Sequence, residues 1–210
     1  IASYLSTKPI IDGDWNDLVN KEYPAEIVVY GSTTWKGRDD LGASFRIAWD
    51  AINLYIADKV RDDQYVQNAT GEDIFKGDSI EILLDTKIAD DYYYTKLSPD
   101  DFQLGITPGR PNTIGTKEAY LWLPTNIAGA RSQVNIAAIR NETEGITRIE
   151  AAIPWSIFEI TPEAGTHFGF ALSVSDNDLS SQNVQQKMVS NVKTRVLTDP
   201  TTWGDLTLGN

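Results

Sequence analysis

Residues 43–60 read ASFRIAWDAINLYIADKV, and this stretch decides the fold. Phe45, Ile47 and Trp49 alternate there with smaller or polar residues, which is the two-residue period of a half-buried strand. The run 54–60 repeats the alternation after a short turn. Two such runs joined by so short a turn predict an antiparallel hairpin.

Further runs of the same kind follow along the chain, separated by turn residues such as Asp12-Gly13 and Glu144-Gly145. They lie at 27–30, 79–84, 102–106, 120–123, 134–139, 146–153 and 168–174. Helical turns are predicted only at 15–19 and 154–158. Many short strands with turn signals between them are typical of an all-β protein, here an antiparallel β-sandwich. A length of 210 residues suits a single domain over 1–210.

The charge balance argues against several kinds of partner. The chain has 30 acidic and 18 basic residues, a formal net charge of -12. Such a surface repels nucleic-acid phosphates and anionic membranes. No apolar run approaches the roughly 20 residues of a membrane-spanning helix, so neither nucleic-acid binding nor membrane insertion is expected.

Catalysis is not expected either. The chain has no cysteine, which excludes cysteine nucleophiles and thiolate metal sites. Its one histidine, His167, starts a predicted strand and is expected on the surface. Neither a Gly-x-Ser-x-Gly elbow nor a phosphate-binding glycine loop accompanies it. A carboxylate pair of the glycosidase type is the alternative that the acidic composition leaves open.

The acidic residues are concentrated in one region. Residues 58–91 contain ten acidic and four basic residues, and Asp100 and Asp101 follow. Closely spaced carboxylates repel one another, and oxygen-rich loops suit Ca²⁺, which takes six to eight oxygen ligands. Asp85 is the strongest candidate because it ends an apolar strand, and we expect Asp85, Asp91 and Asp101 to bind the ion. A solvated acidic surface is the alternative.

Aromatic side chains in polar surroundings are candidates for exposed platforms. Trp35, Phe75, Tyr92, Tyr93 and Tyr94 lie in turn-rich or polar segments. Exposed rings stack on the apolar C–H faces of sugars, which predicts a saccharide site. The alternative for 92–94 is an edge strand whose rings pack alternately on its two faces.

The order of motifs resembles the family 9 carbohydrate-binding modules. The resemblance rests on the stretches 8–15 (KPIIDGDW), 46–50 (RIAWD), 77–85 (GDSIEILLD), 101–104 (DFQL), 150–155 (EAAIPW), 169–176 (GFALSVSD) and 203–208 (WGDLTL). It covers nearly the whole chain. It implies a β-sandwich with Ca²⁺ as structural metal, secreted or at the cell surface as part of a multidomain xylanase or another glycan-active protein.

The resemblance also implies positions for the saccharide site. In the sugar-binding members two tryptophans clamp a terminal sugar, and Phe75 stands at the position of the first. Glu81 matches a glutamate that hydrogen-bonds the sugar. The second ring is missing, because 188–192 read MVSNV, and Gly105 stands where an arginine is expected. We therefore expect a non-catalytic module that binds a polysaccharide or oligosaccharide through Phe75 and Glu81, helped by Trp35, Tyr92 and Tyr94.

Two other functions remain open from the sequence. The missing clamp residues favour a structural or adhesive surface module that self-assembles into a layer or filament and has no sugar site. A related group of sandwiches binds haem b through methionine and lysine, and Lys187-Met188 stand in the corresponding late segment. Visible absorbance of the purified protein distinguishes that haem alternative.

Overall fold

The predicted hairpin forms the centre of one sheet. The computed structural model describes residues 1–18, 20–110 and 116–210. β4 (Leu41–Trp49) pairs antiparallel with β5 (Asn53–Asp62), with Phe45 opposite Asp58. The turn between them is closed by Asp50, whose Oδ1 accepts hydrogen bonds from the backbone N–H groups of residues 52 and 53 at 2.7 Å each. This is an Asx-type turn, a local device that sets the hairpin register.

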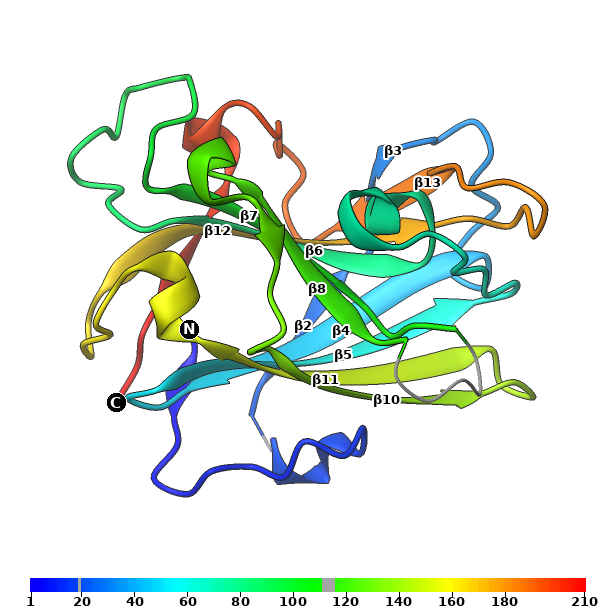
Figure 1. Cartoon of the computed structure of the whole chain (residues 1–210), viewed down its shortest axis with the longest axis horizontal. Coiled ribbons are helices and arrows are strands. Elements are labelled where there is room, and N and C mark those ends of the chain that lie inside the picture. Colours follow the sequence, from blue (N-terminus) through cyan, green and yellow to red (C-terminus); the bar gives the residue numbers. More distant parts are fainter. Residues whose placement is uncertain (19, 111–115) are drawn as a thin grey trace.

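The strands of the described part of the chain form two sheets (Figure 1). The smaller sheet has the order β1–β4–β5–β11–β10, with β2 beside β4. Besides β4 and β5 it contains β1 (Ser3–Tyr4), β2 (Glu22–Ala25), β10 (Asn135–Asn141) and β11 (Ile146–Pro154). The larger sheet has the order β3–β13–β12–β6–β7–β8–β9, with β14 beside β12. Its strands are β3 (Ile27–Tyr30), β6 (Ser79–Asp85), β7 (Asp101–Thr107), β8 (Glu118–Leu123), β9 (Gly129–Ala130), β12 (His167–Asp176), β13 (Lys187–Ser190) and β14 (Gly204–Thr207).

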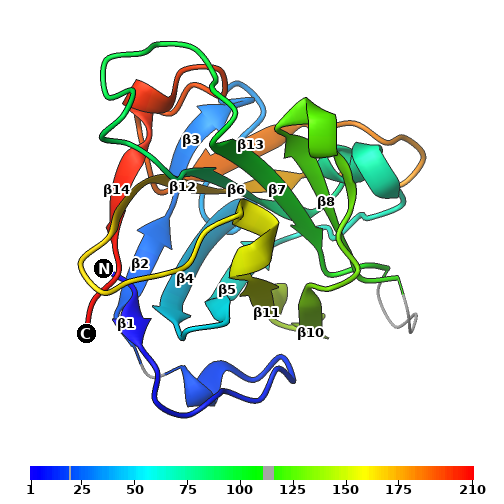
Figure 2. The ribbon, with the colours of Figure 1, turned by 60° about the vertical axis from the view of Figure 1, so that its left-hand side comes forward.

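The two sheets lie face to face with the hydrophobic core between them (Figures 1 and 2). Alternation decides which side chains enter it: Ile80, Ile82 and Leu84 of β6 are buried in the same cluster as Phe45 and Ile47 of β4. The residues between them in β6 therefore face away from the core, on the outer face of the larger sheet. That outer face is where the site described below is built.

The sandwich confirms the predicted fold class. Every strand predicted from alternation is present, with its ends shifted by at most a few residues. Among the strands of two to four residues, β3 was predicted from its continuous apolar run IVVY, whereas β1, β2, β9, β13 and β14 were not, because they are too short to show a period and lack such a run. Helical turns are η1 (Trp15–Asp17), η2 (Gly71–Lys76), η3 (Thr125–Ile127), η4 (Trp155–Phe158) and η5 (Pro200–Thr202). The predicted turn at 15–19 thus begins as expected, and its last residue lies outside the described residues.

Two long connections position the functional side chains. Residues 86–100 join β6 to β7, and 191–203 join β13 to β14. Both views place them next to each other at the same end of the larger sheet (Figures 1 and 2). His167 at the start of β12 is exposed, as predicted, with Nδ1 3.0 Å from Asp205 Oδ2. Among the described residues, no helix is long and apolar enough to span a membrane.

Candidate functional site

The outer face of the larger sheet carries a polar patch centred on Glu81. Because Ile80 and Ile82 enter the core, Glu81 projects from the opposite face of β6. Ser173 of β12 lies beside Glu81 on one side and Gly105 of β7 on the other. Glu81 is nevertheless buried, since side chains from neighbouring elements cover it.

Two of these side chains hold the Glu81 carboxylate. Gln103 Nε2 donates a hydrogen bond to Glu81 Oε2 at 2.8 Å, and the Arg195 guanidinium forms an ion pair with Glu81 Oε1. Arg195 comes from the connection 191–203, so the ion pair ties that connection to the sheet. We call Glu81, Gln103, Ser173 and Arg195 the Glu81 patch.

The Glu81 patch contains polar atoms with unmet hydrogen-bonding capacity. Ser173 Oγ and Arg195 Nε are both buried, and neither has a hydrogen-bond partner among the residues that the structure describes. Burying such atoms without a partner costs free energy, about 1–3 kcal/mol each. A ligand rich in hydroxyl groups offers both donors and acceptors, and it would reach these buried atoms once the side chains that cover them move.

An aromatic surface adjoins the Glu81 patch. A Cβ added at Gly105 would come within 2.2 Å of Trp122 Cη2, so the indole ring lies directly over the glycine next to Glu81. Phe75 of η2 packs edge to face on Trp122 with the ring centroids 6.1 Å apart. Trp122 Nε1 donates to the Glu72 carbonyl oxygen at 2.9 Å, which orients the ring. Flat apolar rings beside polar groups suit a pyranose, which has apolar C–H faces and a polar rim.

Of the residues expected at a saccharide site, Phe75 and Glu81 lie on this face together, connected through Trp122. Trp122 and Arg195 are not among the predicted residues. Trp122 had a signal in the sequence: because Leu121 alternates into the core, Trp122 must project outward. Arg195 had no local signal, since its partner Glu81 lies 114 positions away in the chain.

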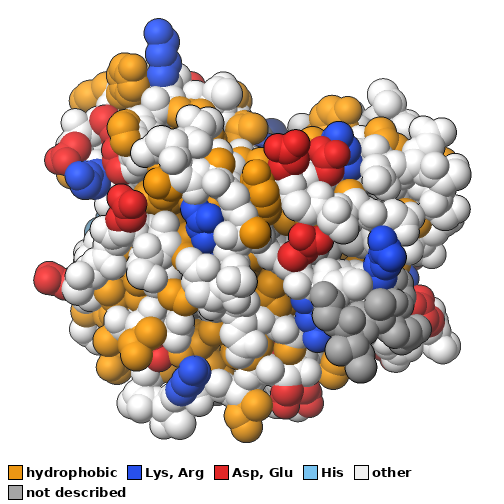
Figure 3. Space-filling model, viewed as in Figure 1, with side chains coloured by type: hydrophobic (Ala, Val, Ile, Leu, Met, Phe, Trp, Pro, Cys, Tyr) orange, Lys and Arg blue, Asp and Glu red, His pale blue; other side chains and the backbone are white. Residues whose placement is uncertain are grey.

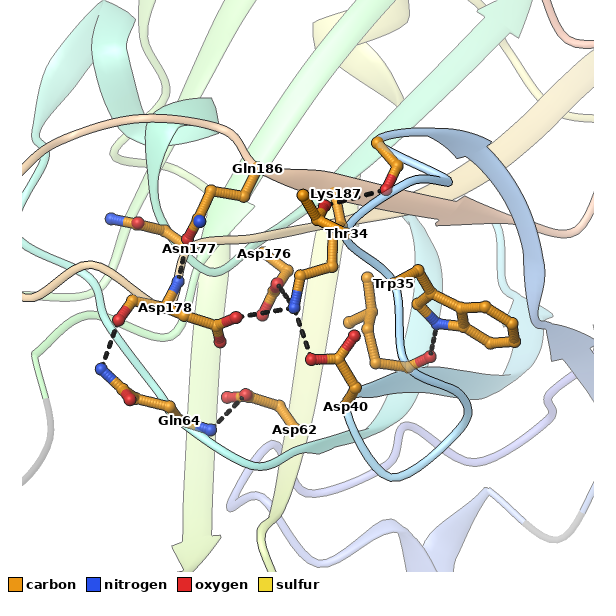
Figure 4. A network of polar contacts seen from close by, with 12 residues as sticks. Thr34, Trp35, Asp40, Asp62, Gln64, Asp176, Asn177, Asp178, Gln186 and Lys187 are labelled. Carbon is orange, nitrogen blue, oxygen red and sulfur yellow. Dashed lines mark hydrogen bonds and ion pairs between the residues drawn. The ribbon is translucent and has the colours of Figure 1, made fainter.

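The structure separates Trp35 from this face. The Trp35 ring packs against the core between the two sheets, and its Nε1 donates to the Leu41 carbonyl oxygen at 2.9 Å (Figure 4). Glu81 projects from the other side of the larger sheet. Trp35 is therefore a half-buried structural residue and not a neighbour of Phe75 and Glu81, because its turn folds back over the core rather than outward.

Tyr92 and Tyr94 are also separated from Phe75. η2 precedes the first residue of β6, whereas 92–94 follow its last residue, and seven strand residues span about 20 Å. The three tyrosines instead line a pocket of about 370 Å³ between the two long connections, together with Asp85, Asp91 and Trp203. We call it the tyrosine pocket. The expected single saccharide site is thus divided between two places.

Three carboxylates meet at the tyrosine pocket. Asp85, Asp91 and Asp100 each place one oxygen within 4.8 Å of the others. Asp101, the third expected metal ligand, lies directly opposite Asp85 in the β6–β7 register, and its Oδ1 is buried without a partner among the described residues. Burial, with a smaller contribution from neighbouring carboxylates, raises the pKa of Asp85 to about 6 and that of Asp101 to about 7. A hard cation would relieve this accumulation of negative charge.

A second group of carboxylates is fully buried at the other end of the sandwich. Asp62, Asp78 and Asp176 bring one oxygen each within 4.8 Å of one another. Burial raises the pKa of Asp62 to about 6, with smaller contributions from the charges of Asp178 and Asp63. Burial, followed by the charges of Asp62 and Asp176, raises the pKa of Asp78 well above its ordinary value. Asp176 Oδ1 has no partner within the described ranges. Residues 175–178 (SDND), which include Asp176, resemble the start of an EF-hand loop but do not continue as one. The sequence pattern alone therefore did not identify Asp176 as a candidate metal ligand.

Lys187 partly neutralises the neighbouring carboxylates (Figure 4). Its Nζ lies 2.6 Å from Asp40 Oδ1, 2.7 Å from Asp178 Oδ2 and 3.0 Å from Asp176 Oδ2. Burial opposes the charge on Lys187, yet the hydrogen bonds that its ammonium group donates to these carboxylates raise the pKa of Lys187 above the ordinary value. Its ammonium group is thus already occupied.

The positions of Lys187 and Met188 contradict the haem alternative. Lys187 and Met188 are consecutive residues of β13 and therefore point to opposite faces of the sheet. Lys187 is bound by carboxylates on one side, while Met188 stands opposite Ser175 on the other. The two side chains cannot act as a ligand pair for one iron atom in this arrangement.

Comparison with known proteins agrees with the fold. The family model described as "Carbohydrate family 9 binding domain-like" matches residues 11–210. The chain is 29% identical over 202 residues to endo-1,4-beta-xylanase A of Thermotoga neapolitana, covering 95% of this chain and 17% of that protein. It is 28% identical over 179 residues to exoglucanase XynX of Acetivibrio thermocellus, covering 85% of this chain and 14% of that protein. The chain thus spans less than a fifth of the length of these relatives.

Two solved structures have the same fold. Both are a carbohydrate-binding module of family 9 from Caldicellulosiruptor kristjanssonii. The complex with cellotriose superposes with a TM-score of 0.68 at 22% identity, covering 99% of this chain and 92% of that one. The complex with glucose gives a TM-score of 0.67 at 20% identity, covering 99% and 95%.

Proposed function

This chain belongs to the carbohydrate family 9 binding domains, and we propose that it binds a β-linked oligosaccharide at the Glu81 patch and the Phe75–Trp122 surface. It is a non-catalytic carbohydrate-binding module of the kind found as an accessory domain in xylanases. The observation that carries the proposal is the juxtaposition of Trp122 and Glu81 across Gly105. One ring stacks on the sugar, and the polar side chains beside it receive its hydroxyl groups.

Chains of glucose or xylose joined by β-1,4 linkages are the proposed ligands. The solved neighbours carry cellotriose and glucose, and the relatives are xylanases and an exoglucanase. A single tryptophan with Phe75 at its edge offers one stacking surface instead of two. We expect weak binding of one sugar ring, with contacts from Gln103 and Arg195 giving orientation.

Arg195 controls entry to the Glu81 carboxylate. Its side chain is only 9% exposed and covers Glu81 Oε1. A sugar that hydrogen-bonds Glu81 directly must displace Arg195, whereas one that bonds Arg195 leaves the ion pair in place. In either case the connection 191–203 takes part in binding.

Ca²⁺ is the proposed structural metal. The orphaned oxygens of Asp101 and Asp176 and the raised pKa values of their neighbours Asp85 and Asp62 support a hard divalent cation at each carboxylate group. We assign one ion to Asp85, Asp91 and Asp100, with Asp101 as a further ligand, and a second to Asp62, Asp78 and Asp176. The ion would neutralise these carboxylates and fix the loops that carry them.

We further propose that the module acts outside the cell as part of a larger protein. Xylan and cellulose are polymers too large to cross a membrane, so a module that binds them must meet them outside. The coverage of the relatives is consistent with a module in a longer chain. Locating the parent protein in the culture medium, on the cell surface or in the cell lysate tests this part.

Calorimetry tests saccharide binding. Titration of the chain in Ca²⁺ with cellohexaose and with xylohexaose is expected to give a binding isotherm for at least one of them. Trp122→Ala should weaken binding at least tenfold, because the ring that stacks on the sugar is lost. Tyr30→Ala, which removes an exposed ring on the edge strand β3, is the matched control and should leave binding unchanged. Absence of heat with both sugars from a folded protein would refute the proposal.

The rival function is a self-assembling surface module. The ion pair between Arg195 and Glu81 favours this function, since a carboxylate that is already paired gains less from binding a ligand. That function predicts concentration-dependent oligomers in size-exclusion chromatography and no saccharide binding. A monomer that binds oligosaccharide excludes it.

A further inference from the structure

The tyrosine pocket combines features that the Glu81 patch lacks. It lies between the connections 86–100 and 191–203. Figure 3 shows acidic, basic and hydrophobic side chains close together at the upper left of the molecule. Its volume of about 370 Å³ is within the range of small-ligand sites, about 300–1,000 Å³. It lies at the opposite end of β6 from Phe75, so it is a separate place on the surface.

The rings in the pocket are unusually exposed for aromatic side chains. Tyr93 is 89% exposed, and Tyr92 and Tyr94 are also exposed. The Tyr92 and Tyr93 rings pack edge to face with centroids 4.9 Å apart, so they hold each other in place although both face solvent. Three consecutive exposed rings beside a pocket form a preformed apolar surface for a ligand.

The carboxylates form the polar wall of the same pocket. Asp85 and Asp91 line it, and each has an oxygen within 4.8 Å of Asp100. Behind them, Asp101 is 0% exposed, faces Asp85 across the strand pair and has an oxygen with no partner among the described residues. That orphaned oxygen is an independent sign that something positively charged belongs there.

A cation held there would have vacant positions on the pocket side. Ca²⁺ takes six to eight oxygen ligands, and three carboxylates supply three to six of them. Because two of the three carboxylates line the pocket, an ion held by them would lie at its wall, where a ligand in the pocket could supply further oxygens. Neighbouring hydroxyl groups of a sugar are neutral, hard oxygen donors spaced closely enough to fill two of them. A cationic peptide would instead compete with the ion for the carboxylates.

We propose that the tyrosine pocket is a second saccharide site, in which a Ca²⁺ ion held by Asp85, Asp91 and Asp100 receives two adjacent sugar hydroxyls while the tyrosine rings pack on the sugar. The inference rests on the Ca²⁺ part of the proposed function and is independent of the Glu81 patch. Binding here depends on Ca²⁺, whereas stacking on Trp122 does not.

Terbium luminescence tests the ion and its distance from the rings together. Tb³⁺ replaces Ca²⁺ at oxygen sites and emits when a nearby excited aromatic ring transfers energy to it. Excitation of the whole chain is expected to give Tb³⁺ emission that Ca²⁺ displaces. Asp91→Asn and the replacement of Tyr92, Tyr93 and Tyr94 by Leu should each remove the part of the emission that comes from this pocket and leave the part that comes from Asp62, Asp78 and Asp176. Tyr30→Leu should leave the emission unchanged. Emission that is insensitive to these variants overturns the assignment.

Titration of the Trp122→Ala protein separates the second site from the first. The probes are methyl glycosides of glucose, xylose and mannose together with cellohexaose and xylohexaose. Binding of at least one probe in Ca²⁺, lost in EDTA and weakened at least tenfold by Tyr93→Ala, supports the proposal. Tyr93 is 89% exposed, so its replacement leaves the core intact.

The failures of the two proposals are distinguishable. If Trp122→Ala abolishes all binding, the second site is refuted and the Glu81 patch stands. If binding survives Trp122→Ala and is unaffected by EDTA and by Tyr93→Ala, the pocket is not the site and the proposal is overturned.

Discussion

Glu81 and Arg195 lie 114 positions apart in the chain and form an ion pair on the outer face of the larger sheet. The pair fastens the connection 191–203 to β6, next to the surface made by Phe75 and Trp122. Both partners are nearly buried: the Arg195 side chain is 9% exposed and the Glu81 side chain 7%. The same contact therefore supports the fold and closes the proposed saccharide site.

Arg195→Met tests the structural role of this pair. Removing one partner of a buried ion pair leaves an uncompensated charge, so the free energy of unfolding should fall by about 3 kcal/mol. The double variant Glu81→Gln with Arg195→Met should recover most of that loss, because no buried charge remains. Urea denaturation measures both. A double variant as unstable as the single one would show that the packing of Arg195, not its charge, is what matters.

Gly105→Ala tests the placement of Trp122 over β7. The new Cβ would lie 2.2 Å from Trp122 Cη2, so the indole must move. We expect a loss of about 1–3 kcal/mol in stability from overpacking, together with weaker oligosaccharide binding. In a Trp122→Ala background the same substitution should cost less, because the space is free. Equal costs in the two backgrounds would contradict the placement of the ring.

Asp58 should make stability depend on pH. Its carboxyl group faces the core, is 0% exposed, and burial raises its pKa to about 8, opposed only weakly by the Lys59 amide. Between about pH 4, the ordinary pKa of an unfolded aspartate, and pH 8 the folded protein keeps a proton that the unfolded chain has lost. This group's contribution to stability therefore decreases as the pH rises through that window, by about 1.4 kcal/mol per pH unit.

Asp58→Asn removes that dependence and leaves the other carboxylates as they are. The stability of the variant relative to the wild type should rise steadily from pH 5 to pH 8 and level off above it. Urea denaturation of both proteins at four pH values measures the difference. Parallel curves over that range would mean that Asp58 is ionised in the folded state.

Chelation tests the structural Ca²⁺. A ligand that binds only the folded state stabilises it, by about 2.7 kcal/mol when its free concentration is 100 times its dissociation constant. For a chain of this size, EDTA should lower the melting temperature by roughly 5–10 °C, and added Ca²⁺ should restore it. In the Asp91→Asn variant, EDTA should still lower the melting temperature, but only by the part that comes from the ion at Asp62, Asp78 and Asp176. An unchanged melting temperature in EDTA argues against a structural ion.

The sequence by itself determined the sandwich. Alternation in 43–60 and in the later runs specifies which side chains enter the core, because a strand's side chains alternate between its two faces wherever the strand lies. The same rule places Glu81 and Trp122 on the outer face. The acidic excess around 58–91 likewise predicted where carboxylates accumulate, and the structure shows them in compact groups at two ends of the sandwich.

The tertiary structure alone decided how these residues combine. Arg195 reaches Glu81, and Tyr92–Tyr94 reach Trp203 instead of Phe75, through the packing of long connections that carry no periodic pattern. Asp100 joins Asp85 and Asp91 for the same reason, although Asp101 is the residue paired with Asp85 in the sheet. Strand patterns are local and can be read along the chain, whereas the contacts between loops depend on which residues distant in sequence the finished sandwich brings together.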